Sequence, residues 1–294
     1  MKCWQLTGSA ENPVLTQRES AQPVPREGEV LVRIHAAGIT PTEVIWWPTT
    51  HTQSGEPRTN PVLSHEFSGE LEGGEAVYGM NDWFVDGALA EYCVTRPEWI
   101  APKPATLTHP EAATVPIGAL TAWQGLFDKA HLQPGERVLI HGGAGAVGVF
   151  AVQFAKQRGA HVVTTVSARN FEFVRSLGAA EVLDYQAEAF DRVLHGIDVV
   201  FDTVGGQTLD RSWNVLRPGG RLVTIAAGSE ATQDERTKAA FFIVEPKRDQ
   251  LIAIGQQIDA GEVRPIVDAL LPWTHAADAF EHRHGRGKTV VQVT

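Results

Sequence analysis

The feature that most constrains this chain is a glycine-rich stretch, "HGGAGAVG", between an apolar run and an amphipathic run that together cover residues 137–160. Within it, Gly143, Gly145 and Gly148 have the spacing G-x-G-x-x-G, which is weak evidence when it stands alone. Here the motif follows a predicted strand and opens a predicted helix, the context in which such a loop holds the pyrophosphate of a dinucleotide. The stretch therefore predicts an α/β domain of the Rossmann type, with a doubly wound parallel sheet.

Each glycine of the loop has a predicted task. Gly143 allows the tight turn, Gly145 lets the backbone approach the pyrophosphate, and Gly148 lets the helix pack closely on the strand. The first turn of the helix presents unpaired N–H groups and a partial positive charge to the phosphates. We expect the cofactor to contact the whole loop, Gly143, Ala144, Gly145, Ala146, Val147 and Gly148. The alternative is a glycine turn that binds nothing.

Strand-like and helix-like runs alternate regularly around this loop. Runs of near-continuous Val, Ile and Leu are typical of strands buried on both faces, as in a parallel sheet. We predict strands at 137–142, 161–166, 181–185, 198–204, 221–226 and 241–245. The helices predicted between them cover 146–159, 170–178, 208–219 and 231–240. The dinucleotide-binding domain is therefore predicted to span residues 115–258.

The segments on either side of the dinucleotide-binding domain have different residue patterns. Residues 1–114 are rich in Pro and Gly with short alternating runs, and Val30, Val32 and Ile34 share one face of such a run. This pattern predicts a compact, irregular β domain. Residues 259–294 hold a proline turn, a short amphipathic helix and a last strand. We predict that this tail returns to the amino-terminal β domain.

The residues after the second strand of the nucleotide domain indicate which dinucleotide is bound. A domain that prefers NAD places an acidic residue there, about 20 residues past the loop, on the ribose 2′-hydroxyl. Ser167 and Arg169 stand at this place, and no carboxylate does. A hydroxyl and a guanidinium suit a 2′-phosphate, so NADPH is favoured over NADH, with Tyr185 beside the adenosine phosphate. The alternative is that Arg169 is only a solvated residue at a helix start.

Composition limits the other functions of this 294-residue chain. Its net charge of −10 argues against a nucleic-acid or anionic-membrane surface, because both need clustered Lys and Arg. No apolar run approaches the roughly 20 residues of a membrane span. Cys3 and Cys93 are the only cysteines, and the amino terminus lacks the apolar core of a signal peptide. We therefore expect a reduced, cytoplasmic protein.

Several motifs beyond the loop stand in a recognisable order: "AAGITPTE", "SHEFSGE", "VPIGALTAWQGL", "DVVFDTVGG", "LRPGGRLVTIA", "FFIVEP" and "RGKTVVQV". With them, essentially the whole chain resembles the medium-chain dehydrogenase/reductase family, specifically its zinc-independent quinone oxidoreductase branch, which includes zeta-crystallin. The resemblance implies a GroES-like β domain, formed by the amino-terminal part and the tail, with the active site in a cleft beside the nucleotide domain. It implies NADPH-dependent hydride transfer, without a metal, to a quinone or an α,β-unsaturated carbonyl. It also implies a homodimer paired near residues 241–245.

The same resemblance assigns residues to the substrate pocket and to the cofactor. Thr40, Trp46, Trp47 and His65 are expected to line one wall of the pocket. The residues expected on the cofactor side are Thr121, Ala226 and Phe242. His65 has two interpretations, a structural residue at a strand end or a proton relay near the nicotinamide. The two tryptophans likewise either line the pocket or belong to the core.

The histidine of "SHEFSGE" raises the question of zinc. In the zinc-dependent branch of the family, this His is one of three protein ligands, with a Cys just after "GI" and a third residue before the nucleotide domain. Those two places hold Thr40 and the run Val-Pro-Ile at 115–117, so only His65 remains. One histidine cannot hold the ion, and we predict no metal. The "HRH" run at 282–284 is predicted to be solvated surface rather than a metal site.

Two departures from the family leave the substrate open. The segment "GELEGGEAVYG", residues 69–79, is shorter than the usual hairpin, and Thr40 with the Trp pair replaces the usual Asn and tyrosines. An enoyl-thioester or polyketide-type enoyl reductase is one alternative function, and a non-catalytic NADPH-binding protein is another. A zinc alcohol dehydrogenase is a third, which metal analysis would exclude.

Overall fold

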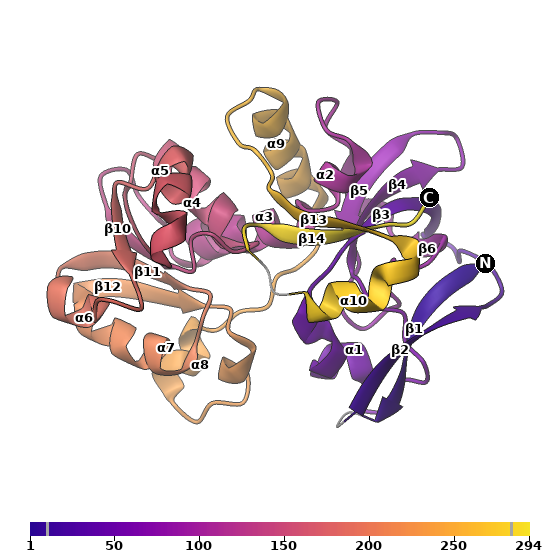
Figure 1. Cartoon of the computed structure of the whole chain (residues 1–294), viewed down its shortest axis with the longest axis horizontal. Helices are drawn as coiled ribbons and strands as arrows, with labels where there is room; N and C mark the ends of the chain where they lie inside the picture. The colour runs from indigo at the N-terminus through magenta and orange to yellow at the C-terminus, as the bar shows by residue number, and fades with distance from the viewer. Residues whose placement is uncertain (10–11, 283–284) are drawn as a thin grey trace. The chain divides into compact units, whose positions relative to one another are not determined.

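The protein divides into two compact units in the computed structural model, which describes residues 1–9, 12–282 and 285–294 (Figure 1). Unit 1 comprises Met1–Leu120 together with Glu245–Thr294, and unit 2 comprises Thr121–Val244. Unit 1 is therefore assembled from two segments that lie far apart in the sequence, whereas unit 2 is continuous.

Unit 2 is built around a five-stranded parallel sheet with the order β10-β9-β8-β11-β12. Its strands are β8 (Arg137–His141), β9 (His161–Val166), β10 (Glu181–Asp184), β11 (Ile197–Asp202) and β12 (Leu216–Thr224). Its helices are α4 (Gly148–Gln157), α5 (Phe171–Leu177), α6 (Phe190–Val193), α7 (Gly206–Ser212) and α8 (Glu235–Ala240). The strand order reverses between β8 and β11, as in a doubly wound Rossmann sheet, and the predicted fold class is confirmed.

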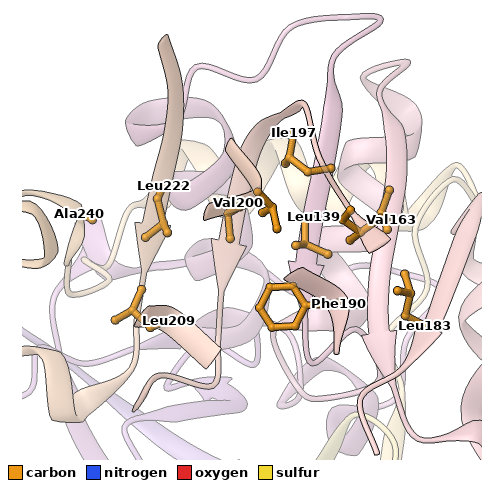
Figure 2. Packing of buried hydrophobic residues seen from close by; sticks show 11 residues of the cluster. Leu139, Val163, Leu183, Phe190, Ile197, Val200, Leu209, Leu222 and Ala240 are labelled. Atoms are coloured by element: carbon orange, nitrogen blue, oxygen red, sulfur yellow. The ribbon is translucent and has the colours of Figure 1, made fainter. Parts of the chain in front are cut away.

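One buried cluster of unit 2 lies against this sheet, and each strand contributes a branched aliphatic residue to it (Figure 2). Leu139 of β8 is the register partner of Val163 on one side and of Val200 on the other, and Leu222 of β12 pairs with Val200. Phe190 of α6 packs against this row. Each such buried side chain stabilises the fold by about 1.5–3 kcal/mol, so the alternation of apolar runs directly builds the sheet that carries the glycine loop.

The strand predicted at 241–245 is wrong. Phe241 makes only an isolated parallel bridge to Thr224, at the edge where a sixth strand would lie. Pro246 follows shortly afterwards, and a proline lacks the N–H that a ladder needs and restricts the residue before it. Phe242 is buried without pairing in a strand. The apolar run therefore signalled burial and not strand pairing.

The helix predicted at 208–219 is shorter than expected. Helix α7 ends at Ser212, a 3-10 turn covers Trp213–Val215, and β12 begins at Leu216. Pro218 has no N–H and cannot continue a helix. The run "LRPGG", which we interpreted as a helix end, lies in the strand instead.

Unit 1 is built around a seven-stranded sheet with the order β13-β14-β3-β4-β5-β7, to which β6 adds by pairing with β3. These strands are β3 (Val30–Gly38), β4 (Glu66–Leu71), β5 (Ala76–Met80), β6 (Tyr92–Thr95), β7 (Ile100–Pro102), β13 (Val267–Pro272) and β14 (Lys288–Gln292). A separate antiparallel ribbon consists of β1 (Lys2–Ser9) and β2 (Asn12–Glu19). The helices are α1 (Trp47–Thr50), α2 (His109–Ala112), α3 (Pro116–Trp123, which continues into unit 2), α9 (Arg248–Asp259) and α10 (Ala276–Glu281). This irregular β-rich unit is the GroES-like domain, and none of the helices described in either unit is long and apolar enough to cross a membrane.

The tail returns to unit 1 as predicted. Strand β14 pairs antiparallel with β3, with Val291 opposite Ala37. Strand β13, which we did not predict, lies parallel beside β14 at the edge of the sheet. It ends in Pro272, and a missing N–H is tolerated at such an edge. Its sequence "VDALLP" does not alternate cleanly, so no pattern marked it as a strand.

The units divide at different points from the boundaries predicted at 114/115 and 258/259. The structure places α9 in unit 1. There, Tyr78 Oη donates to Leu251 O at 2.6 Å, and the Arg248 guanidinium donates to Ile100 O at 2.6 Å. The pattern of strand and helix continues into α9 without a change in composition, so the sequence gives no sign of this crossing.

Candidate functional site

The glycine loop after β8 is packed so tightly that side chains do not fit at two of its positions. A Cβ on Gly148 would lie 2.1 Å from Gly142 O, and a Cβ on Gly143 would lie 2.1 Å from Thr164 Oγ1. The bare Gly148 lets the start of α4 touch the end of β8. The left-handed residue of the turn is Gly142, with φ 75°, one position before Gly143, which we predicted to allow the tight turn. Gly143 is instead the point of contact with the neighbouring strand β9.

Gly145 is the loop position with room for a ligand's approach. A Cβ there would meet only Gly142 O, at 3.3 Å. Gly145 N donates to Gly142 O at 2.9 Å and Gly145 O accepts from Val149 N at 3.0 Å, so the loop has a fixed shape. Within the first turn of α4, Val149 N donates to Gly145 O, and Phe150 N and Ala151 N donate to Val147 O, so this helix start attracts an anion through its partial positive charge. A rigid, bare backbone at a helix start fits the pyrophosphate of a dinucleotide.

Other predicted cofactor residues come from loops at the same edge of the sheet. In a parallel sheet the carboxyl ends of all strands lie at one edge. Ser167 and Arg169 follow β9, Tyr185 follows β10 and Ala226 follows β12. Because β9 and β10 are paired neighbours, Ser167 and Tyr185 lie at adjacent strand ends. Arg169 and Tyr185 are both exposed to solvent. The structure thus brings these residues to one edge together with the loop.

Two further residues of the predicted cofactor set are buried. Thr121 is 3 % exposed and Phe242 is 8 % exposed. The ring of Phe242 packs against Gly125, on which a Cβ would lie 3.1 Å from the ring. Phe242 N donates to Thr224 O at 3.2 Å. Both side chains lie in packed positions here, and their contact with a cofactor stays a prediction.

Asp202, at the end of β11, is a buried carboxylate that the sequence analysis missed. It accepts hydrogen bonds from Val204 N and Gly205 N at 3.1 Å and from Thr224 Oγ1 at 2.8 Å. Burial raises the pKa of this carboxyl, although the three donors oppose the shift. The side chain fixes the loop after β11 at the carboxyl edge. An Asp just before a Gly pair, in "DTVGG", is a local turn signal that could have identified it.

In unit 1, His65 is fully buried and both of its ring nitrogens are engaged. Nε2 lies 3.0 Å from Val85 O, and Nδ1 lies 3.2 Å from Glu43 Oε2. A carbonyl only accepts, so Nε2 carries a hydrogen and one further proton lies between Nδ1 and the carboxylate. Ser64, with φ 67°, turns the chain just before this histidine and its N–H donates to Glu43 at 2.6 Å. The geometry supports the structural interpretation of His65.

Next to His65 in the sequence, Glu66 forms a buried ion pair with Lys288 of β14. Glu66 also accepts from Ile117 N at 2.9 Å. Burial raises the pKa of the Glu66 carboxyl, against the opposing effect of the lysine. Lys288 Nζ in turn donates to Thr40 Oγ1 at 3.1 Å. The Thr40 hydroxyl is therefore an acceptor from the lysine, and its own hydrogen is available to donate.

The two predicted tryptophans have different surroundings. The ring of Trp46 meets Trp83 edge-on with centroids 4.5 Å apart, and Trp83 lies 5.2 Å from the ring of His65. Trp47 instead stacks on His51 at 3.4 Å and is 52 % exposed. The structure thus groups Trp46 with His65, through Trp83, and separates Trp47 from them.

The three family positions for a catalytic zinc do not fit an ion. Both nitrogens of His65 are bonded within the protein, the Thr40 hydroxyl is bonded by a lysine, and Val115 is apolar and buried. Tetrahedral zinc needs three protein ligands besides water in such a site, and these positions do not supply them. These three positions are therefore not assigned to a metal ion. Of the "HRH" run at 282–284, the residues at 283 and 284 lie outside the described part of the chain.

Known proteins resemble the chain both in sequence and in structure. Residues 177–291 match the model of a family described as zinc-binding dehydrogenase. A probable zinc-binding mitochondrial oxidoreductase of Arthroderma benhamiae is 31 % identical over 308 residues, which cover 95 % of this chain and 93 % of that protein. A chloroplastic NADPH-dependent alkenal/one oxidoreductase of Arabidopsis thaliana is 30 % identical, over 99 % of this chain and 79 % of that protein. The solved quinone oxidoreductase of Coxiella burnetii has a TM-score of 0.88 at 27 % identity, covering 100 % of this chain and 99 % of that chain.

Proposed function

The chain belongs to the medium-chain dehydrogenase/reductase family, and we propose that it transfers a hydride from NADPH to a quinone or an α,β-unsaturated carbonyl without the help of a metal. The observation that carries this proposal is the Thr40 hydroxyl held by Lys288. It stands where the zinc-dependent branch has a cysteine ligand. The quinone and alkenal/one oxidoreductases among the similar proteins support the substrate class.

We assign the dinucleotide to the carboxyl edge of the unit 2 sheet. The bare backbone of Gly143–Gly148 and the start of α4 receive the pyrophosphate. Ser167 and the exposed Arg169 receive the ribose 2′-phosphate, because a guanidinium forms strong charged hydrogen bonds with phosphate. Asp202 keeps the neighbouring loop in place. When it is bound, NADPH supplies the hydride.

Thr40 has the task of stabilising the negative charge that develops on the substrate oxygen. Its hydroxyl accepts from Lys288 Nζ and donates its own hydrogen to an enolate or hydroquinone oxygen. Lys288 is held by Glu66, and Glu66 is held by Ile117 N. This series of contacts holds the Thr40 oxygen in place. A positioned donor of this kind stabilises the negative charge on the substrate oxygen, as the metal does in the zinc-dependent branch.

The proton that completes the reduction comes from solvent in this proposal. His65 is fully buried and both of its nitrogens are bonded, so we do not assign it as a direct proton donor. The partly exposed ring of Trp46, held by Trp83, offers an apolar face to a flat substrate. The exposed Trp47 is not assigned to the pocket wall.

The test is a screen of NADPH oxidation by the full chain against quinones, enones, enals and a crotonyl thioester. We expect turnover of a quinone, an enone or an enal. Thr40→Val keeps the shape of the side chain and removes the hydroxyl, so we expect kcat to fall about 100-fold with the dissociation constant of NADPH unchanged. Thr42→Val, at an exposed neighbour, is the matched control and should behave like the wild type.

Other outcomes of the same screen favour other functions. Turnover of the crotonyl thioester alone would indicate an enoyl-thioester reductase. NADPH binding without turnover of any substrate would indicate a non-catalytic binding protein. Oxidation of alcohols that is lost after chelation would overturn the proposal of metal-free chemistry.

We also propose that the chain forms a homodimer and works in the cytoplasm. Strand β12 ends the sheet of unit 2, and beyond it Phe241 adds only an isolated bridge. An incompletely paired edge is suited to pair with a second copy. Light scattering should give twice the mass of one chain, and a monomeric mass at micromolar concentration would contradict the dimer. Fluorescence microscopy of a tagged full chain tests the location.

A further inference from the structure

Three side chains of metal-binding types, none of which the proposed function uses, come together in unit 1: His35, Glu70 and His109. One ligand atom from each lies within 4.8 Å of the others. His35 belongs to β3, Glu70 to β4, and His109 is the first residue of α2. All three are partly buried, and the two imidazole rings stack with centroids 4.3 Å apart. The group therefore joins two strands and a helix.

A β-bulge places His35 in this group. The register between β3 and β4 shifts between Ile34 and Ala36, which leaves His35 as the extra residue of the bulged strand. A bulge re-aims the side chain of the residue that it adds. On the opposite strand, Ser68 and Glu70 share one face because they are two positions apart. The bulge is what allows a residue of β3 to meet that face.

Hydrogen bonds fix both histidines in the same tautomer. Ser68 Oγ donates its one hydrogen to a carbonyl of β5 at 3.0 Å, so it must accept from His109 Nδ1, which lies 2.8 Å away. Thr294 Oγ1 donates to Ile34 O at 3.1 Å and therefore accepts from His35 Nδ1 at 3.0 Å. In each neutral ring Nε2 then carries the lone pair. Metal-binding histidines are oriented in this way, by a hydrogen bond from their second nitrogen.

The lone pair of His35 faces a carboxylate. His35 Nε2 lies 3.3 Å from Glu70 Oε2, yet this buried nitrogen has no partner in hydrogen-bond geometry. Two acceptors so close together need a proton or a cation between them, since a buried polar atom without a partner is costly. His109 Nε2 adds a third lone pair to the group.

We propose that His35, Glu70 and His109 bind a divalent transition-metal ion of the zinc type, with water completing its coordination. Two imidazoles and one carboxylate are a ligand set that zinc accepts in proteins, whereas Mg²⁺ and Ca²⁺ prefer oxygen ligands. Ligand atoms on one tetrahedral zinc lie about 3.4 Å apart, and the three ligand atoms here already lie within 4.8 Å of one another. The group therefore needs only a small closure to bind an ion. The ion ties β3, β4 and α2 together and is separate from the positions of Thr40 and His65.

The test is a calorimetric titration of the metal-free full chain with Zn²⁺ alone, at pH 7.5. We expect one ion per chain and a rise in the unfolding temperature with added Zn²⁺, because a ligand that binds only the folded state stabilises it. Each of His35→Asn, His109→Asn and Glu70→Gln should weaken binding at least about 100-fold, and Ser68→Ala, which frees the ring of His109, about 10-fold. Co²⁺ should report the site by its visible absorption, lost in the same variants.

The matched control is His161→Asn in unit 2. His161 Nε2 lies 2.6 Å from Glu181 Oε1, which makes an exposed histidine–carboxylate pair that is not part of this three-residue group. This variant should bind Zn²⁺ like the wild type. Binding that survives both His35→Asn and His109→Asn, no binding at millimolar Zn²⁺, or equal binding of Mg²⁺ would each overturn the proposal. Glu70→Gln has the same shape as the native residue, so it keeps the test decisive if a histidine variant fails to fold by circular dichroism.

Discussion

The two units bury their polar groups in opposite ways. Unit 1 buries ionisable side chains in pairs, Glu66 with Lys288 and Glu43 with His65. Unit 2 buries polar groups against uncharged partners, His141 beside two hydroxyls and Asp202 beside backbone N–H groups and a hydroxyl. Its glycine loop has bare backbone at the sheet edge. The partners in unit 1 come from distant parts of the chain, whereas the loop in unit 2 is a short continuous segment. The stability of unit 1 therefore depends on long-range charge pairing, and the binding capacity of unit 2 depends on local backbone geometry.

Breaking the Glu66–Lys288 pair should have the largest effect. Lys288→Met leaves a carboxylate buried without its cation, and we expect the free energy of unfolding to fall by about 3–5 kcal/mol. Burial raises the pKa of Glu66. The protonated form of Glu66 is therefore favoured in the folded state. The loss in the free energy of unfolding should grow as pH rises above the ordinary pKa of a glutamate. Urea unfolding at pH 5 and pH 8 measures both effects.

The control for this pair is the double variant Glu66→Leu/Lys288→Met. Replacing both partners by apolar residues removes the uncompensated charge, so the double variant should be more stable than Lys288→Met alone. Equal losses in the single and double variants would show that the ion pair does not hold this region.

Changing the loop of unit 2 should abolish binding and leave the fold intact. The backbone at Gly145 is less crowded than at Gly143 and Gly148, since a Cβ there would meet only Gly142 O, at 3.3 Å, and needs a shift of a few tenths of an ångström. Gly145→Val should therefore fold but block the pyrophosphate, weakening NADPH at least about 100-fold, which is about 2.7 kcal/mol. Fluorescence titration with NADPH measures this. Gly73→Val, at a glycine with open space around it, is the control, and unchanged NADPH binding in Gly145→Val would refute the role of the loop.

The neutral histidine of unit 2 should make stability depend on pH. Ser212 Oγ donates to Thr208 O at 2.7 Å and so accepts from His141 Nε2, while Thr165 Oγ1 lies 2.9 Å from Nδ1. Burial, with a smaller effect of Arg211, lowers the pKa of His141 to about 3. A lowered pKa gives stability that is present above pH 6.5 and is lost as pH falls toward 3.

Between pH 7 and pH 5, His141 should account for a loss of about 2 kcal/mol in the free energy of unfolding. His141→Gln should remove this part of the slope, and urea unfolding at several pH values measures it. His275→Gln, at an exposed histidine, should keep the wild-type slope. If His141→Gln also keeps it, the buried ring is not the origin of the pH dependence.

The smallest effect is expected at Arg169, on the exposed side of the nucleotide edge. If its guanidinium meets the 2′-phosphate, Arg169→Ala should weaken NADPH about 10-fold, since a hydrogen bond to a charged group contributes about 1.5 kcal/mol or more. NADH has no 2′-phosphate and should bind equally well to both forms. Arg192→Ala, at another exposed arginine of unit 2, is the control. Equal weakening of NADPH and NADH would contradict the assignment.

The difference between contacts within a short segment and contacts between distant parts of the chain also decides which features could be predicted from the sequence. The strand at 161–166 and the turn around Gly148 depend on neighbours within a few residues, and the sequence analysis identified both. Lys288 reaches Glu66 only because β14 pairs with β3, and no local pattern announces that contact. The apolar run at 241–245 shows the remaining limit, since burial and strand pairing give the same apolar signal.

The candidate site of unit 1 illustrates why functional residues were missed. His65 stood out because its motif suggests a zinc ligand, whereas its partner Glu43 lies in a different motif, "AAGITPTE", and the sequence analysis gave it no role. Trp83 was missed for the same reason, although it links Trp46 to His65. Such groups are joined by the fold and not by spacing, so sequence patterns alone do not place them.

Unit 1 is made of two segments that are separated in the sequence by unit 2, and this affects how the chain folds as it leaves the ribosome. Strand β6 covers Val30–Arg33 of β3, but Ala36–Gly38 are covered only when β14 arrives. The whole of unit 2 is synthesised before then, and domains tend to fold as units during synthesis. The nascent chain thus carries a finished nucleotide domain while one edge of Ala36–Gly38 in β3, whose other edge pairs with β4, is still uncovered. Uncovered strand edges promote aggregation, so this interval of translation is when the chain most needs a chaperone.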